Sequence, residues 1–300
     1  MCNVRPESLS ILTVGTRASC DVAFWDVERN QVEFSLNVGH SVDFALVSTA
    51  HKAVVCGGID SGAVLAISLT GGSVEHASRA EEYRGMTDMT VAVDNIFIAT
   101  PASGVAVISV SDGVATGKLC DPDGPSVPTK LLVNSCSDAQ LIVGYEHGLI
   151  HIFDVDTETV ICSLSGHSGR VNSLRLLPSG QLVSAADDLR GIIWNHEPYL
   201  DQRSPGSVAA EHGMWTRSEP RGQEMEKVDC GDVLECSLDY RASCFTVDGT
   251  QHLIYAGFVS GLVQIWDLET GQCRVCLHLF VCDSAQVDSL YKTAQCLGKK

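Results

Sequence analysis

The chain has 300 residues, enough for one large domain or two ordinary ones, and 45% of them are hydrophobic, too many for a chain that is disordered throughout. Its 20 Lys and Arg against 37 Asp and Glu give a net charge of −17. This charge repels phosphate backbones and anionic lipid surfaces, so we expect neither direct nucleic-acid binding nor membrane binding.

The N-terminal segment contains three short apolar runs with period-two alternation, at Leu9–Val14, Val22–Trp25 and Gln31–Leu36. Similar runs continue along the chain, and helical periodicity never lasts for the about 11 residues that a helix needs, so the sequence predicts an all-β protein. The first ten residues, MCNVRPESLS, lack the apolar run of a signal peptide. We therefore expect a cytoplasmic or nuclear protein whose 13 scattered cysteines are reduced core thiols.

The strands repeat along the chain. Residues 166–195 read GHSGRVNSLRLLPSGQLVSAADDLRGIIWN, and residues 242–273 read ASCFTVDGTQHLIYAGFVSGLVQIWDLETGQC. Each segment holds a strand, a Gly turn, a second strand, a tight turn and a third strand that ends in Trp with Asp or Asn. Alignment on that third strand selects six positions at intervals of 41, 43, 44, 41 and 72 residues: Trp25, Ala66, Ser109, Phe153, Trp194 and Trp266.

The first four intervals match the roughly 40–45 residues of a WD repeat. With the two segments above, they make the chain resemble the WD-repeat family. The resemblance implies a β-propeller built from one four-stranded blade per repeat. It also implies the usual role of such propellers, which is to hold other proteins together without chemistry of their own.

The early repeats depart from the family pattern. Blade two keeps Gly39–His40 and Asp60 but aligns Ala66 with the tryptophan, and blade four has His147 at the aspartate position. Residues 99–154 read ATPASGVAVISV, then an acidic Pro-rich loop, and end with LIVGYEHGLIHIFD. This stretch is similar to the ASTRA-associated, G-beta-like family of propellers, which is linked to chaperone assemblies that mature large kinases. That resemblance implies a subunit of such an assembly.

Blade five carries the residues of the structural hydrogen-bond tetrad that the WD-repeat resemblance implies: His167, Ser184, Asp188 and Trp194. Asp188 stands in the tight turn six residues before Trp194, where it can accept from the His167 imidazole, and the Ser184 hydroxyl can meet the indole N–H. A His–Ser–Asp trio also suggests a hydrolase. The tetrad buries its serine, however, and the chain has no GxSxG elbow, so we expect no enzyme and no catalytic residue.

The interval of 72 residues contains about 30 residues more than a WD repeat needs. We place the excess at residues 196–232, an acidic insertion between the third and fourth strands of blade five, with Val233–Leu238 as the fourth strand. The insertion contains three prolines and eight acidic residues, which favour a flexible loop. Within it, Met214 and Trp215 form a candidate linear docking motif. The alternative is that both side chains fold back onto the propeller wall.

The two ends of the chain complement each other. The three N-terminal strands correspond to the second, third and fourth strands of a blade, so this blade lacks its first strand. Gln286–Tyr291, near the C-terminus, has the pattern of such a first strand. Joining them would close blade one and remove exposed sheet edges. We therefore expect residues 1–300 to form a single propeller of six four-stranded blades, closed by one C-terminal and three N-terminal strands. The alternative is seven blades, with the last one missing from this chain or supplied by a partner.

A cofactor is not expected. Cys273 and Cys276 form one CxxC pair, but no second pair and no nearby histidine cluster completes a zinc site, so we predict no metal. The chain also contains no HExxH, GxGxxG or calcium-loop motif. We expect no small-molecule substrate.

The expected function is a non-catalytic protein–protein interaction scaffold or adaptor in a multiprotein complex. Because of the negative charge, a basic partner is favoured over an acidic one. Two alternatives stay open: a reader of a basic or modified peptide at the mouth of the central channel, and a chaperone-complex subunit for large-kinase maturation. Besides Met214 and Trp215, the candidate partner-binding residues lie in loops of the best-defined repeats: Glu146, His147, Arg170, Asp187, Arg190 and Phe258.

Overall fold

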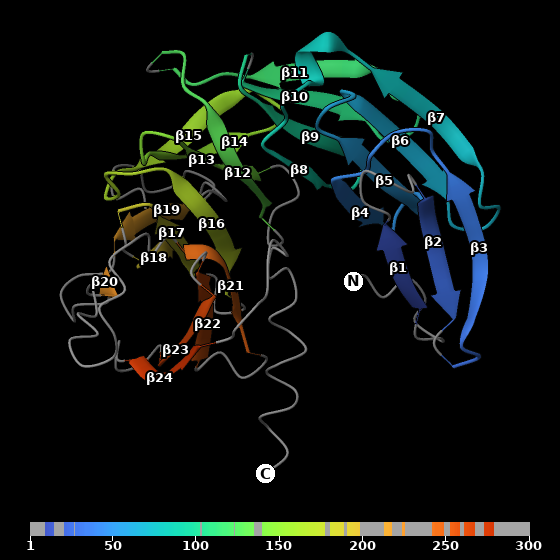
Figure 1. Cartoon of the computed structure of the whole chain (residues 1–300). Helices are drawn as coiled ribbons and strands as arrows, with labels where there is room; N and C mark the ends of the chain where they lie inside the picture. The colour runs from blue at the N-terminus through green and yellow to red at the C-terminus, as the bar shows by residue number, and fades with distance from the viewer. Residues whose placement is uncertain are drawn as a thin grey trace. The chain divides into compact units, whose positions relative to one another are not determined.

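The computed structural model describes most of the first 198 residues and the strand-forming parts of the remainder. The described residues are 10–14, 21–26, 28–102, 104–122, 124–134, 140–177, 181–188, 191–198, 213–217, 224–225, 242–248, 253–258, 261–267 and 273–278. They form antiparallel strands in six separate sheets and one short 3-10 helix (Figure 1). The predicted all-β class is therefore confirmed.

The sheets follow one another along the chain, and each is a meander of consecutive strands. The first sheet has three strands: β1 (Ser10–Val14), β2 (Asp21–Asp26) and β3 (Gln31–Asn37). The second contains β4 (Phe44–Ser48), β5 (Ala53–Gly58), β6 (Ala63–Ser68) and β7 (Val74–Arg79). After the 3-10 helix η1 (Glu81–Tyr83), the third contains β8 (Asp88–Val91), β9 (Asn95–Thr100), β10 (Gly104–Ser109) and β11 (Ala115–Leu119).

The later sheets repeat this order. The fourth contains β12 (Pro128–Val133), β13 (Gln140–Tyr145), β14 (Ile150–Asp154) and β15 (Thr159–Leu164). The fifth contains β16 (Val171–Leu176), β17 (Leu182–Ala186), β18 (Gly191–Pro198) and β19 (Gly213–Arg217), and the short β20 (Glu224–Met225) also pairs with β18. The sixth contains β21 (Ala242–Val247), β22 (Leu253–Phe258), β23 (Leu262–Asp267) and β24 (Cys273–His278).

The chain divides into two compact units. Unit 1 consists of Met1–Val143 and Phe153–Val160, and unit 2 consists of Gly144–Ile152 and Ile161–Lys300. The three N-terminal strands predicted from the sequence are β1, β2 and β3. The predicted closing strand, Gln286–Tyr291, lies outside the described residues, so closure of the first sheet and a count of six blades stay predictions.

Apolar side chains pack between the faces of successive sheets. In unit 1, Phe24 of β2 stacks on Phe34 of β3 with 4.5 Å between ring centroids, and the same cluster includes Val54 and Ile67 of the second sheet. A further cluster joins the second and third sheets around Met86. In unit 2, a cluster that includes Val183 and Trp266 joins the fifth and sixth sheets. Period-two strands with apolar residues on both faces therefore bury these sheets against one another within each unit.

A β-bulge recurs in the pairing of the last two strands in four of the sheets. The register shifts just before Trp25 in the first sheet and just before Trp266 in the sixth. The same shift precedes Ile67 in the second sheet and Ile108 in the third. A bulge inserts one residue and re-aims the side chain beside it, so it marks equivalent positions in the repeats.

The bulges correct the sequence alignment at two positions. Ile67 and Ile108 occupy the tryptophan position, in place of Ala66 and Ser109, and both are completely buried. The first four intervals become 42, 41, 45 and 41 residues. The alignment was displaced by one residue because Ile, Ala and Val follow one another in these strands, and period-two alternation does not distinguish neighbouring registers in a strand that is buried on both faces.

The fifth sheet differs from the sequence analysis at its outer strand. We placed Met214 and Trp215 inside a flexible insertion and assigned Val233–Leu238 as the fourth strand. In the structure, β19 contains both residues and pairs with β18, with Trp215 opposite His196 and Met214 opposite Glu197. Residues 233–238 lie outside the described residues, as does most of 196–232. The described residues contain no helix with the length and hydropathy that a membrane span requires.

Candidate functional site

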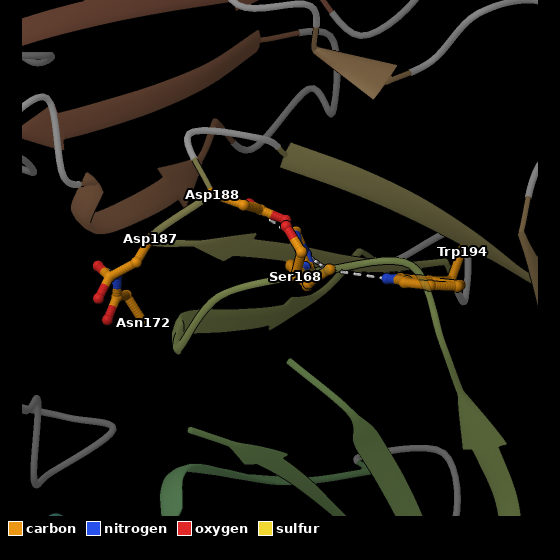
Figure 2. A network of polar contacts seen from close by, with 7 residues as sticks. Ser168, Asn172, Asp187, Asp188 and Trp194 are labelled. Carbon is orange, nitrogen blue, oxygen red and sulfur yellow. Dashed lines mark hydrogen bonds and ion pairs between the residues drawn. The ribbon is translucent and has the colours of Figure 1, made fainter. Parts of the chain in front are cut away.

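A polar network of unit 2 links three elements of the fifth sheet (Figure 2). The His167 ring, in the connection before β16, donates from Nδ1 to the Asp188 carboxylate at 3.0 Å. Its Nε2 lies 2.8 Å from Ser184 Oγ on β17, and Trp194 on β18 donates from Nε1 to the same oxygen at 2.8 Å. The structure thus brings together all four residues that the sequence analysis assigned to the tetrad.

The donors and acceptors of this network are arranged so that each buried group has a partner. A carboxylate accepts only, so His167 carries its proton on Nδ1, and the unprotonated Nε2 accepts from the Ser184 hydroxyl. Ser184 in turn accepts from the indole N–H. Asp188 also accepts from the backbone N–H of Ser168 at 2.9 Å. The network ties the connection before β16 to the turn after β17, and each lost member would leave a buried polar group unsatisfied.

The tetrad serine is not presented to a substrate. Ser184 is completely buried within β17, and its hydroxyl lies between an imidazole and an indole. A nucleophilic serine must instead meet a reacting carbonyl beside an oxyanion hole. The chemistry of this trio is therefore structural. Among the described residues, no group of three or more His, Cys, Asp and Glu side chains has the arrangement of a metal site.

Three turns of unit 2 lie backbone against backbone beside the tetrad. Gly148, with φ of 93°, closes the turn between β13 and β14, and a Cβ there would lie 2.5 Å from the His167 carbonyl oxygen. A Cβ on Gly169 would lie 2.8 Å from the backbone nitrogen of Asp188. The Asp187 N–H donates to the Arg170 carbonyl at 2.9 Å. The absence of side chains at both glycines allows this close stacking.

This stacking gathers four of the candidate partner-binding residues on one surface. We call this surface the unit 2 rim and define it by Glu146, His147, Arg170 and Asp187. Glu146, His147 and Arg170 are exposed, and Asp187 is half-buried. The His147 ring lies 5.6 Å from the Tyr145 ring, which is completely buried, so His147 stands on the core at its base.

Asn172 supports the rim and was not identified by the sequence analysis. Its Nδ2 donates to Asp187 Oδ1 at 2.6 Å, which directs Asp187 away from the tetrad while the adjacent Asp188 points into it (Figure 2). In the second sheet, Asp43 Oδ2 accepts from the N–H of Ile59 at 2.7 Å and holds the corresponding turn. Both residues follow a valine shortly after a Gly–His pair, so comparison of GHSGRVN with GHSVD contained the signal.

The other four candidates are not among the residues that define the rim. Phe258, at the end of β22, is half-buried and packs against the apolar cluster that includes Ala185 and Trp266. The sequence analysis predicts Phe258 as a partner-binding candidate, and in the structure its apolar ring contributes to the core between two sheets. Arg190 lies outside the described residues. Met214 and Trp215 are in β19, as described above.

Other sheets have different residues at the tetrad serine position. Trp194 pairs with Leu182, two residues before Ser184. In the second sheet Ile67 pairs with Val54, so Cys56, two residues later, takes the serine position. In the sixth sheet Trp266 pairs with Ile254, so Ala256 takes the serine position. Neither residue reproduces the serine hydrogen bonds, so apolar packing replaces the network in these two sheets.

Burial at this position makes Cys56 unreactive. The Cys56 side chain is completely buried, and desolvation raises the pKa of its thiol to about 12. At mildly alkaline pH we expect iodoacetamide to alkylate Cys56 at least about 100-fold more slowly than the exposed Cys120, because the thiolate is the nucleophile. Peptide mass spectrometry over a labelling time course measures both rates in one sample. Equal rates in the native protein would contradict this assignment.

Comparison with known proteins adds two findings. The "Guanine nucleotide-binding protein subunit beta-like protein 1" of Mus musculus is 41% identical over 168 residues, which cover 46% of this chain and 51% of that protein. The chain therefore spans about half the length of this curated relative. The crystal structure of the Cps50 (Swd1) β-propeller domain of Myceliophteria thermophila superposes with a TM-score of 0.66 at 16% identity, and covers 91% of this chain and 90% of that one. No protein-family model matches the chain.

Proposed function

The chain has the fold of a WD-repeat β-propeller, and from this premise we propose that it is a non-catalytic scaffold that holds proteins together in a cytoplasmic or nuclear complex. The unit 2 rim is its docking surface. WD40 propellers generally act as interaction scaffolds, but a fold by itself does not determine a function, so the proposal depends on the geometry of this rim.

The observation that carries the proposal is the combination of exposed charged side chains with a rigid backbone beneath them. Glu146 and Arg170 extend from turns that stack directly on each other, and the buried tetrad anchors the connection and turn beside them. A surface already ordered in the free protein loses less conformational entropy on association, so more of the contact energy appears as affinity. The buried Ser184 supports the non-catalytic part of the proposal.

A more specific role is a subunit of a chaperone assembly that matures large kinases. Two observations favour it. The stretch from Ala99 to Asp154 is similar to the ASTRA-associated, G-beta-like family, and the curated mouse relative is itself named a beta-like protein. In this role the rim would hold a subunit of the assembly or its kinase client.

The test is affinity capture with cross-linking mass spectrometry, from cells that express the tagged chain at native level. We expect Glu146→Lys to reduce recovery of rim partners at least about fivefold, because the new charge repels a partner group that the glutamate attracted. Glu75→Lys is the matched control, since Glu75 is exposed on β7 in unit 1 and receives the same charge change. Recovered chaperone subunits and large kinases would support the more specific role. No reproducible partner, or equal losses in the two variants, would overturn the docking proposal.

A further inference from the structure

Charged groups of the unit 2 rim remain available to a partner. Glu146 and Arg170 are exposed, and neither forms a hydrogen bond or ion pair through its side chain with a described residue. Asp187 uses Oδ1 to accept from Asn172, and its Oδ2 accepts from no described residue. These opposite charges lie on adjoining turns and form no ion pair with one another. Each charged group can therefore form an ion pair with a partner.

The order of the charges along the rim follows from the backbone contacts. The connection that carries Arg170 touches the turn of Glu146, because Gly148 lies against His167 and Gly169. The same connection touches the turn of Asp187, through Gly169 and through the bond from the Asp187 N–H to the Arg170 carbonyl. The rim therefore presents a carboxylate, a guanidinium and a second carboxylate in that order, on a backbone held by hydrogen bonds.

Taking this rim as the docking surface of the proposed scaffold, we infer that it binds a protein segment in which one acidic side chain lies between two basic ones. Each partner charge then meets its opposite on the rim, and the planar Arg170 guanidinium suits a carboxylate. A wholly basic segment places a cation against Arg170, and a wholly acidic one places anions against Glu146 and Asp187. Such like-charge contacts reject incorrect partners more effectively than the favourable contacts select correct ones.

The experiment uses the full chain and synthetic probe peptides of Gly and Ser that carry three charged residues at varied spacing. The charge patterns are Lys-Glu-Lys, Lys-Lys-Lys and Glu-Lys-Glu, and fluorescence anisotropy measures affinity at low and at physiological ionic strength. We expect the best Lys-Glu-Lys peptide to bind at least about fivefold more tightly than Lys-Lys-Lys of the same spacing. In Arg170→Glu the preference should reverse, because the rim then carries three carboxylates.

Arg175→Glu is the control for this reversal. Arg175 is exposed on β16 outside the rim, where it donates to the Leu174 carbonyl, and its reversal changes the net charge of the chain equally. The inference is overturned if the native chain binds no peptide, if it binds Lys-Lys-Lys as tightly as Lys-Glu-Lys, or if both arginine variants shift the preference alike.

The outcomes separate this inference from the scaffold proposal. Loss of captured partners in Glu146→Lys without any preference for charge order would retain the scaffold and reject the charge pattern. A clear preference with unchanged capture in Glu146→Lys would retain the recognition of the segment and reject the rim as the scaffold's docking surface.

Discussion

Replacing Trp194 by alanine should lower the free energy of unfolding by about 3–5 kcal/mol, the range for truncation of a large aromatic side chain in a packed core. Trp194 is only 2% exposed, so its removal leaves a cavity in the fifth sheet. The substitution also removes the indole N–H that donates to Ser184, so the buried Ser184 hydroxyl loses one hydrogen bond of the tetrad. Guanidinium unfolding followed by circular dichroism measures the loss.

Trp25 provides a matched control for this substitution. It occupies the equivalent position beside the bulge of the first sheet but is 37% exposed. We expect Trp25→Ala to lower stability by about 1 kcal/mol, because less apolar area returns to water. Trp194→Phe retains most of the apolar packing and removes the hydrogen bond, so its effect should lie between the two. Similar losses in Trp25→Ala and Trp194→Ala would show that the tetrad sheet is no better packed than the first sheet.

Gly148→Ala should lower the free energy of unfolding by about 2–4 kcal/mol. It should also weaken binding at the rim, and the fold-change should be similar in the capture assay and in the peptide titrations. Its φ of 93° is a conformation that alanine adopts with strain. In addition, the new Cβ would lie 2.5 Å from the His167 carbonyl oxygen, so the turn that carries Glu146 must move away from the connection that carries Arg170. Unfolding curves and the peptide titrations together measure both effects.

Gly39→Ala separates backbone strain from the clash. Gly39 also has a positive φ, 76°, but a Cβ there would meet no atom within 4 Å. We expect a loss of about 1 kcal/mol, from strain alone, and no change in binding at the rim. Equal losses of stability in the two variants would mean that the turn at Gly148 is not tightly stacked on the His167 connection.

These two pairs of variants test one physical idea about the molecule. The buried tetrad and the stacked turns make the unit 2 rim rigid, and the rigid rim carries the charged groups that we propose for docking. Trp194 acts within the fifth sheet, and Gly148 acts where the turn of Glu146 meets the connection of Arg170. If the rim works as proposed, the first substitution lowers stability throughout the fifth sheet, and the second alters recognition as well as stability.

Much of the local structure could be predicted from residue order. Alternation of apolar and polar residues located β1, β2 and β3 to within one or two residues at each end. The resemblance to the WD-repeat family implied a hydrogen-bond network of His167, Ser184, Asp188 and Trp194, and the structure contains it. These predictions succeed because strand alternation is a local property, and because a buried polar residue with matched partners in the same repeat has few other arrangements that satisfy it.

The tertiary structure decided the features that depend on contacts between segments distant along the chain. Ile67 and Ile108 replace Ala66 and Ser109 at the tryptophan position because a bulge sets the register, and an apolar run fits several registers equally well. Phe258 packs inward because the fifth sheet offers an apolar surface beside it. The gathering of Glu146, Arg170 and Asp187 requires Gly148 and Gly169 to lie against neighbouring backbone. Residue order alone thus determined the strands and their repeat, whereas packing between them determined which side chains meet, because close contact depends on the shape of both surfaces.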